Sequence, residues 1–151
     1  MAPSALALVN TLFQAGARVQ RLFEQHDWAF CFIGGVANFR WGTPRLTNDL
    51  DLTLLTGFGN EAAYAGALLA EFDSRIAGAM EFAMQNRVLL LRTPDGFGID
   101  VALGAIPFEA SAIERSSNVE RRTGAWCDAA HLFCRRPHRA QGVCRTTAGL
   151  G

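Results

Sequence analysis

The sequence predicts one α+β domain, in which a small mixed or antiparallel sheet is backed by helices on at least one face. Two stretches repeat their apolar residues at helical spacing, polar and apolar residues alternate over Asp49 to Leu55, and two β-rich runs flank a Pro-Asp-Gly turn. With 151 residues, 50% hydrophobic and 19% charged, the chain has the size and apolar content of a single globular domain.

The first half of the chain is expected to form a helix, a strand and a glycine turn. Residues from about Ser4 to His26 place their apolar side chains on one helical face. Trp28 to Ile33 is an aromatic, β-rich run that ends at Gly34-Gly35. Residues 36–40 can then form a helical turn, which Gly42-Thr43-Pro44 breaks.

The second half is expected to add strands and a further helix. Asp49 to Leu55 reads as a strand with its polar residues on one face. Glu61 to about Ile76 reads as an amphipathic helix. The runs Arg87 to Arg92 and Phe97 to Leu103, joined by Pro94-Asp95-Gly96, predict a hairpin.

Charge and hydropathy restrict the partners that we expect. Lysine plus arginine total 14 and aspartate plus glutamate total 14, so no overall basic field attracts nucleic acid. A polynucleotide would need a local patch, and the candidates, if they are not simply scattered surface arginines, are Arg40, Arg45, Arg115, Arg121 and Arg122. No signal peptide is recognisable and no apolar stretch could span a bilayer, so we expect a cytoplasmic protein with no membrane partner.

Three aspartates are the candidate metal ligands. Asp49 and Asp51 are separated by one residue on a strand and therefore project to the same side. Asp100 lies between apolar residues on another predicted strand, where an unpaired carboxylate is costly to bury. If the two strands are neighbours, three carboxylates converge, and such a cluster suits Mg²⁺ or Mn²⁺. The alternative is that Asp-x-Asp is only the solvent face of an amphipathic strand.

The Gly34-Gly35 turn is a candidate phosphate site. Backbone N–H groups at a glycine turn that opens a helix can approach phosphate oxygens without interference from side chains. Between this turn and the aspartates lie Arg45, whose guanidinium can hold a triphosphate, and Thr47, whose hydroxyl can cap or orient the loop. An ordinary surface position remains the alternative for Arg45.

These motifs, in this order, resemble the polymerase-β-type nucleotidyltransferase superfamily, and more narrowly the AbiEii/AbiGii-type toxin nucleotidyltransferases and their minimal relatives. The resemblance covers roughly Phe32 to Phe108 and rests on Ile33-Gly34-Gly35-Val36-Ala37, on Asp49-Leu50-Asp51-Leu52 and on Ile99-Asp100-Val101. Where many members of the superfamily have serine directly after the glycine, this chain has Val36.

The resemblance implies a minimal nucleotidyltransferase fold and a metal-dependent activity. The enzyme would transfer a nucleoside monophosphate from a nucleoside triphosphate (NTP) to an acceptor hydroxyl of RNA, such as a tRNA end, or of a protein, and it could be the toxin of a toxin–antitoxin pair. By resemblance, Asp49, Asp51 and Asp100 bind the metals, with Asp100 also helping to deprotonate the acceptor, while Gly34 and Gly35 seat the phosphates.

The C-terminal part departs from this family. Relatives follow the third carboxylate with a helix that carries Asp-Leu, a lysine and a downstream aspartate, whereas this chain contains no lysine. Residues 127–151 are rich in Cys, Arg, His, Pro and Gly, and a reading frame shifted by one base turns Gln141 into Lys or Arg and can restore Asp-Leu from Arg136 onward. We therefore expect a nucleotidyltransferase-like domain over residues 1–126 and an out-of-frame or disordered tail over 127–151.

Two alternatives follow from this tail. Without the family's lysine, the chain could be a catalytically inactive module that keeps the fold and binds a nucleotide or a partner. The other takes the tail's soft ligands as a zinc site in an interaction domain, formed by Cys127, His131, Cys134, His138 and Cys144.

Overall fold

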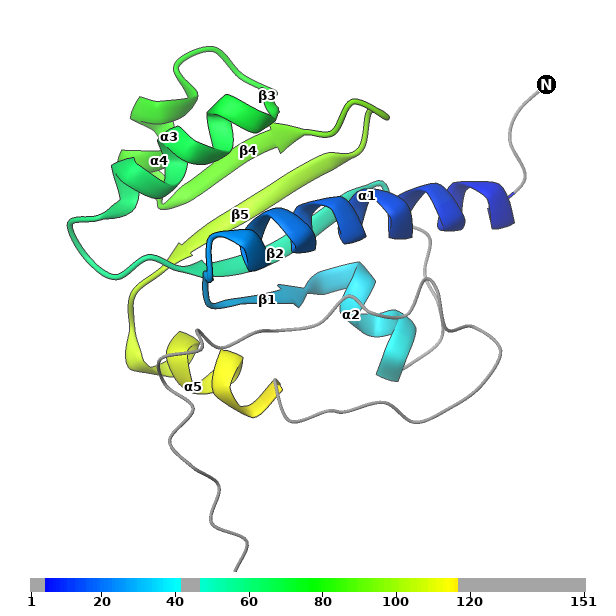
Figure 1. Cartoon of the computed structure of the whole chain (residues 1–151), viewed down its shortest axis with the longest axis horizontal. Helices are drawn as coiled ribbons and strands as arrows, with labels where there is room; N and C mark the ends of the chain where they lie inside the picture. Colours follow the sequence, from blue (N-terminus) through cyan, green and yellow to red (C-terminus); the bar gives the residue numbers. More distant parts are fainter. Residues whose placement is uncertain (1–4, 42–46, 117–151) are drawn as a thin grey trace, which may run out of the picture.

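The computed structural model describes residues 5–41 and 47–116, and these form a mixed α+β domain (Figure 1). The predicted fold class is therefore confirmed. The elements are, in chain order, α1 (Ala5–Gln25), β1 (Phe30–Ile33), α2 (Gly34–Trp41), β2 (Asp49–Leu55), α3 (Glu61–Glu71), β3 (Asp73–Ser74), α4 (Ala79–Asn86), β4 (Val88–Arg92), β5 (Gly98–Gly104) and α5 (Pro107–Ser116).

The five strands form one sheet in the order β1-β2-β5-β4-β3. β2 and β5 run parallel at its centre, and the other three neighbouring pairs are antiparallel. The predicted hairpin is present as β4 and β5, and its turn is closed by the hydrogen bonds from Thr93 N–H to Phe97 O (2.8 Å) and from Gly96 N–H to Thr93 O (2.9 Å).

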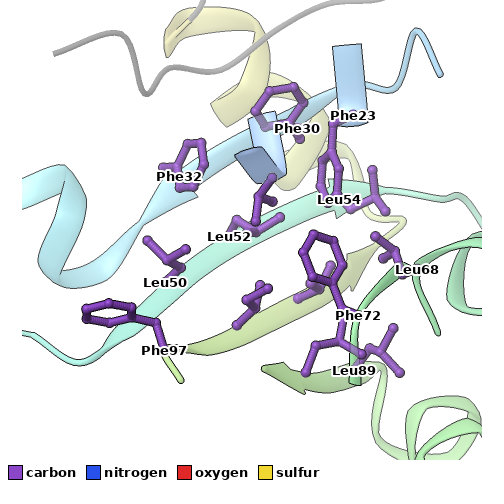
Figure 2. Close-up of a cluster of buried hydrophobic side chains, with 14 of the residues drawn as sticks. Phe23, Phe30, Phe32, Leu50, Leu52, Leu54, Leu68, Phe72, Leu89 and Phe97 are labelled. Carbon is purple, nitrogen blue, oxygen red and sulfur yellow. The ribbon is translucent and has the colours of Figure 1, made fainter. Parts of the chain in front are cut away.

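One face of the sheet carries the main hydrophobic core (Figure 2). Alternate residues of β2 and β5 point into it, as the two-residue period of a strand requires. Leu12, Val19 and Phe23 of α1 cover these strands, and α3 and α4 add leucine and alanine side chains towards β4. Each fully buried leucine or phenylalanine of this kind stabilises the fold by about 1.5–3 kcal/mol.

The opposite face is covered in a different way. Ile113 of α5 packs there against Ala29, Cys31 and Leu55, near β1 and the end of β2. β2 places Asp49, Asp51 and Thr53 on this same face, in alternation with the buried leucines. This face is called the carboxylate face below.

The structure corrects one predicted element and adds three. The helix expected from Glu61 to about Ile76 ends at Glu71, because Phe72 turns to extended backbone (φ −130°, ψ 144°) and the chain continues as β3. Phe72 is buried and Ile76 packs on the same core, so the apolar pattern continued past the end of the helix. The elements β3, α4 and α5 were not predicted from the sequence. The expected boundary at residue 126 and the tail 127–151 lie outside the described residues.

Candidate functional site

The three aspartates lie on adjacent strands of the carboxylate face. In the parallel pairing of β2 with β5, Asp51 is opposite Asp100 and Asp49 is opposite Gly98. Neighbouring strands are about 4.8 Å apart, so residues in register across this pair are next to one another. The condition on which the sequence interpretation depended, that the two strands are neighbours, is thereby met.

Asp51 lies against the glycine turn at the start of α2. Gly34 has φ +63°, and a Cβ placed on it would overlap the carboxylate of Asp51, with the Asp51 Cγ atom only 3.0 Å away. The backbone N–H of Gly35 donates a hydrogen bond to the same carboxylate. Glycine is therefore required here by both conformation and space, and the positive end of the α2 dipole faces a negative charge.

Burial raises the pKa of Asp51 above its ordinary value of 3.8, and the negative charge of Asp49 raises it further. The hydrogen bond from Gly35 and the charge of Arg75 act in the opposite direction and offset part of this rise. Asp51 is thus a carboxylate that this surrounding does not fully neutralise, and it would gain from a nearby cation.

Thr47 holds the start of β2 next to the same turn. Its hydroxyl donates to Asp49 O (3.1 Å) and accepts from Asp49 N–H (3.3 Å). A Cβ on Gly35 would come within 2.8 Å of the Thr47 Cβ atom, so the two backbones approach as closely as a glycine allows. Thr47 therefore orients Asp49 and lines the glycine turn.

Arg75 connects two of the carboxylates. It follows β3 directly, and its backbone N–H donates to Leu90 O (3.0 Å), which extends the β3–β4 pairing by one residue. Its guanidinium donates a charge-assisted hydrogen bond to Asp100 Oδ1, and its Nη1 atom lies 3.6 Å from Asp49 Oδ1. These three side chains remain partly open to solvent, with 30%, 35% and 49% of Arg75, Asp100 and Asp49 exposed.

Gly98 leaves the space in which Arg75 and Asp49 approach each other. A Cβ on Gly98 would overlap Asp49 Oδ1 and lie 2.9 Å from Arg75 Nη1. Neither Arg75 nor Gly98 was assigned to the site from the sequence. The Gly-Ile-Asp run of β5 was visible in the sequence, but Arg75 was assigned to a helix, and no local pattern links it to an aspartate 25 residues further along the chain.

Asp49, Asp51, Asp100, Gly34, Gly35 and Thr47 are thus brought together by the fold. Arg45 lies outside the described residues, and so do the cysteines and histidines considered for zinc. Of the five arginines considered for a basic patch, Arg115 is exposed in the last turn of α5, and the structure does not describe the side chains of the other four.

The donor set of the carboxylate face is suited to a hard divalent cation, because carboxylate oxygens are the ligands that Mg²⁺ and Mn²⁺ prefer. Within residues 5–41 and 47–116, no three His, Cys, Asp or Glu side chains are grouped closely enough to hold one ion in the arrangement seen here. The Asp49 and Asp100 carboxylates instead share the guanidinium of Arg75.

Comparisons with protein-family models, with curated proteins and with solved structures found no match to this chain. Among the helices in the described part of the chain, none combines the length and the apolar character needed to cross a membrane.

Proposed function

We propose that the carboxylate face is the active site of a metal-dependent nucleotidyltransferase of the polymerase-β type. The observation that carries the proposal is the pairing of Asp51 with Asp100 on parallel strands, directly beside the Gly34-Gly35 turn. Carboxylates for a divalent cation and backbone N–H groups for phosphates are the two parts that a metal–nucleotide complex requires.

The proposed reaction transfers a nucleoside monophosphate. The oxygen of an acceptor hydroxyl attacks the α-phosphorus of the NTP, the bond from that phosphorus to the bridging oxygen breaks, and pyrophosphate leaves with the electron pair. Asp100 accepts the proton of the hydroxyl. A bound Mg²⁺ or Mn²⁺ would neutralise charge on the phosphates and on the attacking oxygen.

The residues of this chain have separate tasks in the proposed site. Asp49 and Asp51 would hold the cation, and Asp100 would complete its ligands. The N–H groups at the start of α2 would bind phosphate oxygens, because the partial positive charge of a helix N-terminus attracts anions. Because Gly35 N–H donates to Asp51 here, a bound phosphate would have to share or take over this donor.

A transfer assay tests the proposal. The chain is incubated with each of the four NTPs labelled at the α-phosphate, with Mg²⁺ or Mn²⁺, and with either total tRNA or a protein mixture as acceptor. We expect label on one acceptor class, and its loss by at least a hundredfold in Asp51→Asn and Asp100→Asn. Asp73→Asn is the control, since Asp73 is an exposed carboxylate on the β3 edge of the same sheet.

The assay separates this proposal from its nearest alternative, a module that binds a nucleotide or a partner without catalysis. The absence of lysine from the chain and the engagement of Asp100 by Arg75 favour that alternative. Metal-dependent nucleotide binding without transfer to either acceptor would support the binding module. Label transfer that survives both Asn variants would contradict a role for the carboxylates.

A further inference from the structure

Arg75 forms two ion pairs on the carboxylate face, yet it has no task in the proposed transfer reaction. It directly follows β3, and its guanidinium is directed at Asp49 and Asp100, two of the three carboxylates proposed to hold a divalent cation. Its ion pairs join β5 and β2 to the edge strand β3, across the β4 that separates them in the sheet.

The positive charge of Arg75 stands where the charge of a metal ion would be required. Asp100 Oδ1 accepts directly from Nη2 of the guanidinium, and Asp49 Oδ1 lies 3.6 Å from Nη1. A cation bound by these two oxygens needs the same space and the same lone pairs. The guanidinium and a metal ion on these two oxygens would therefore exclude one another.

We propose that Arg75 is a displaceable internal counter-ion, which holds Asp49 and Asp100 in the metal-free protein and must leave before a divalent cation binds. This inference rests on the proposed metal site. The 30% exposure of the Arg75 side chain leaves it a route into solvent, and the bond from its backbone N–H to Leu90 O keeps the residue beside the site after displacement. When no nucleotide is bound, Arg75 thereby lowers the affinity of the site for a divalent cation.

The direction of the effect distinguishes this role from a structural one. If Arg75 only supported the carboxylates, its removal would disorder them and weaken metal binding. If it competes with the cation, its removal strengthens metal binding, because the negative charges of the two carboxylates are then no longer offset by the guanidinium.

The test is the Mn²⁺ affinity of the full chain, measured from the electron paramagnetic resonance signal of free Mn²⁺, for the wild type, Arg75→Gln and Arg92→Gln. Glutamine keeps most of the length of arginine and removes the charge. Arg92 is the matched control, because it is an exposed arginine on the same face, paired in register with Gly98, and its change removes the same unit charge. Circular dichroism verifies that each variant is folded.

We expect Arg75→Gln to bind Mn²⁺ at least fivefold more tightly than the wild type, and Arg92→Gln to change the affinity less than twofold, since a solvent-screened charge acts weakly. Arg75→Lys keeps the charge without the planar donor pair, so its Mn²⁺ affinity should lie between those of the wild type and Arg75→Gln. Mn²⁺ binding by Arg75→Gln but not by the wild type would also support the proposal, because Arg75 would then block the metal site completely.

Equal or weaker Mn²⁺ binding by Arg75→Gln, with binding retained by the wild type, would overturn the role of Arg75 and leave the metal site intact. Absence of binding in the wild type and in all variants would overturn the proposed metal site itself, and this inference with it.

A measurement on the unaltered chain guards against a variant that fails to fold. In ¹⁵N spectra, addition of diamagnetic Mg²⁺ should broaden or shift the side-chain Nε–Hε signal of Arg75 as the guanidinium moves into solvent, while that of Arg92 stays in place. An unchanged Arg75 signal at a Mg²⁺ concentration that shifts the Asp51 and Asp100 amides would contradict the displacement.

Discussion

Alanine at Gly34 should destabilise the domain more than alanine at another glycine of the same backbone conformation. Gly34 has φ +63° and Gly78 has φ +66°, so Gly→Ala introduces the same left-handed strain at both positions, about 1–2 kcal/mol. At Gly78 the new Cβ makes only ordinary contact, 3.5 Å from Glu81 Oε2. At Gly34 it overlaps the Asp51 carboxylate.

The collision adds a second cost that the control lacks. Asp51 must leave its rotamer, which costs about 0.5–1.5 kcal/mol. It also loses the hydrogen bond from Gly35 N–H, for which water substitutes only in part, at about 1 kcal/mol. We therefore expect Gly34→Ala to cost about 2.5–4.5 kcal/mol and Gly78→Ala about 1–2 kcal/mol.

Urea denaturation followed by tryptophan fluorescence measures both values, because Trp28 packs against Phe23 and Tyr64 in the core. In an Asp51→Ala background the overlapping Oδ2 and Cγ atoms are absent and only the Cβ atom, 3.1 Å away, remains close, so most of the extra cost of Gly34→Ala should disappear. Equal destabilisation by the two alanines in the wild-type background would refute the close approach of the glycine turn to Asp51.

Three further predictions concern charge and the core. Asp51→Asn should stabilise the protein by about 0.5 kcal/mol at pH 7. The pKa of Asp51 is raised because the folded protein disfavours the ionised carboxylate, so the gain should vanish below pH 3.8, where the group is protonated in the folded and the unfolded state. A constant gain from pH 3 to 7 would contradict this. Glu61→Gln should destabilise the protein at pH 7, because a hydrogen bond from the residue's own backbone N–H and one from Arg87 lower the pKa of Glu61 below 4.5. In thermal melts at successive pH values, the difference from the wild type should disappear as the pH falls through the lowered pKa. Leu52→Ala should lower the free energy of unfolding by about 3 kcal/mol, since Leu52 is fully buried under α1. Thr53→Ala on the carboxylate face should lower it by about 1 kcal/mol or less. Similar urea midpoints for the two variants would argue against the assigned core face.

Strands were predictable where one face is buried and the other is not. β2 alternates strictly between buried leucines and partly exposed residues, which are polar except for the last, and it spans the residues that the sequence indicated, Asp49 to Leu55. The adjacency of β2 and β5 was harder to predict, because parallel strands are paired through a connection of more than 40 residues and no local signal fixes their register.

Helices were less predictable where apolar spacing continued past their ends. Phe72 and Ile76 both reach the core, so the helical pattern ran through the turn into β3. The start of α5 did carry a signal that was overlooked. Pro107 occupies its first position, and Glu109 Oε2 accepts the N–H groups of Ala105 and Ile106, as in a helix cap.

The site was predictable in its carboxylates and glycines and not in its counter-ion. Asp-x-Asp on a strand and a glycine turn after a strand are local patterns, and each has a direct physical meaning. Arg75 depends on the path of the chain after α3, which brings β3 to the edge of the sheet beside β4. A long-range ion pair of this kind leaves no periodic trace in the sequence.

Asp49, Asp51 and Asp100, which lie beside the glycine turn, are proposed to bind a divalent cation. Paramagnetic broadening by Mn²⁺ in the ¹⁵N spectrum of the wild-type chain tests this proposal most directly. We predict that trace Mn²⁺ selectively broadens the amides of Gly34, Gly35, Asp51 and Asp100, leaves those of Gly57 and α5 unaffected, and loses this selectivity in Asp51→Asn. Broadening centred on other residues, or none at millimolar Mn²⁺ in both the wild type and Arg75→Gln, would contradict the proposed metal site.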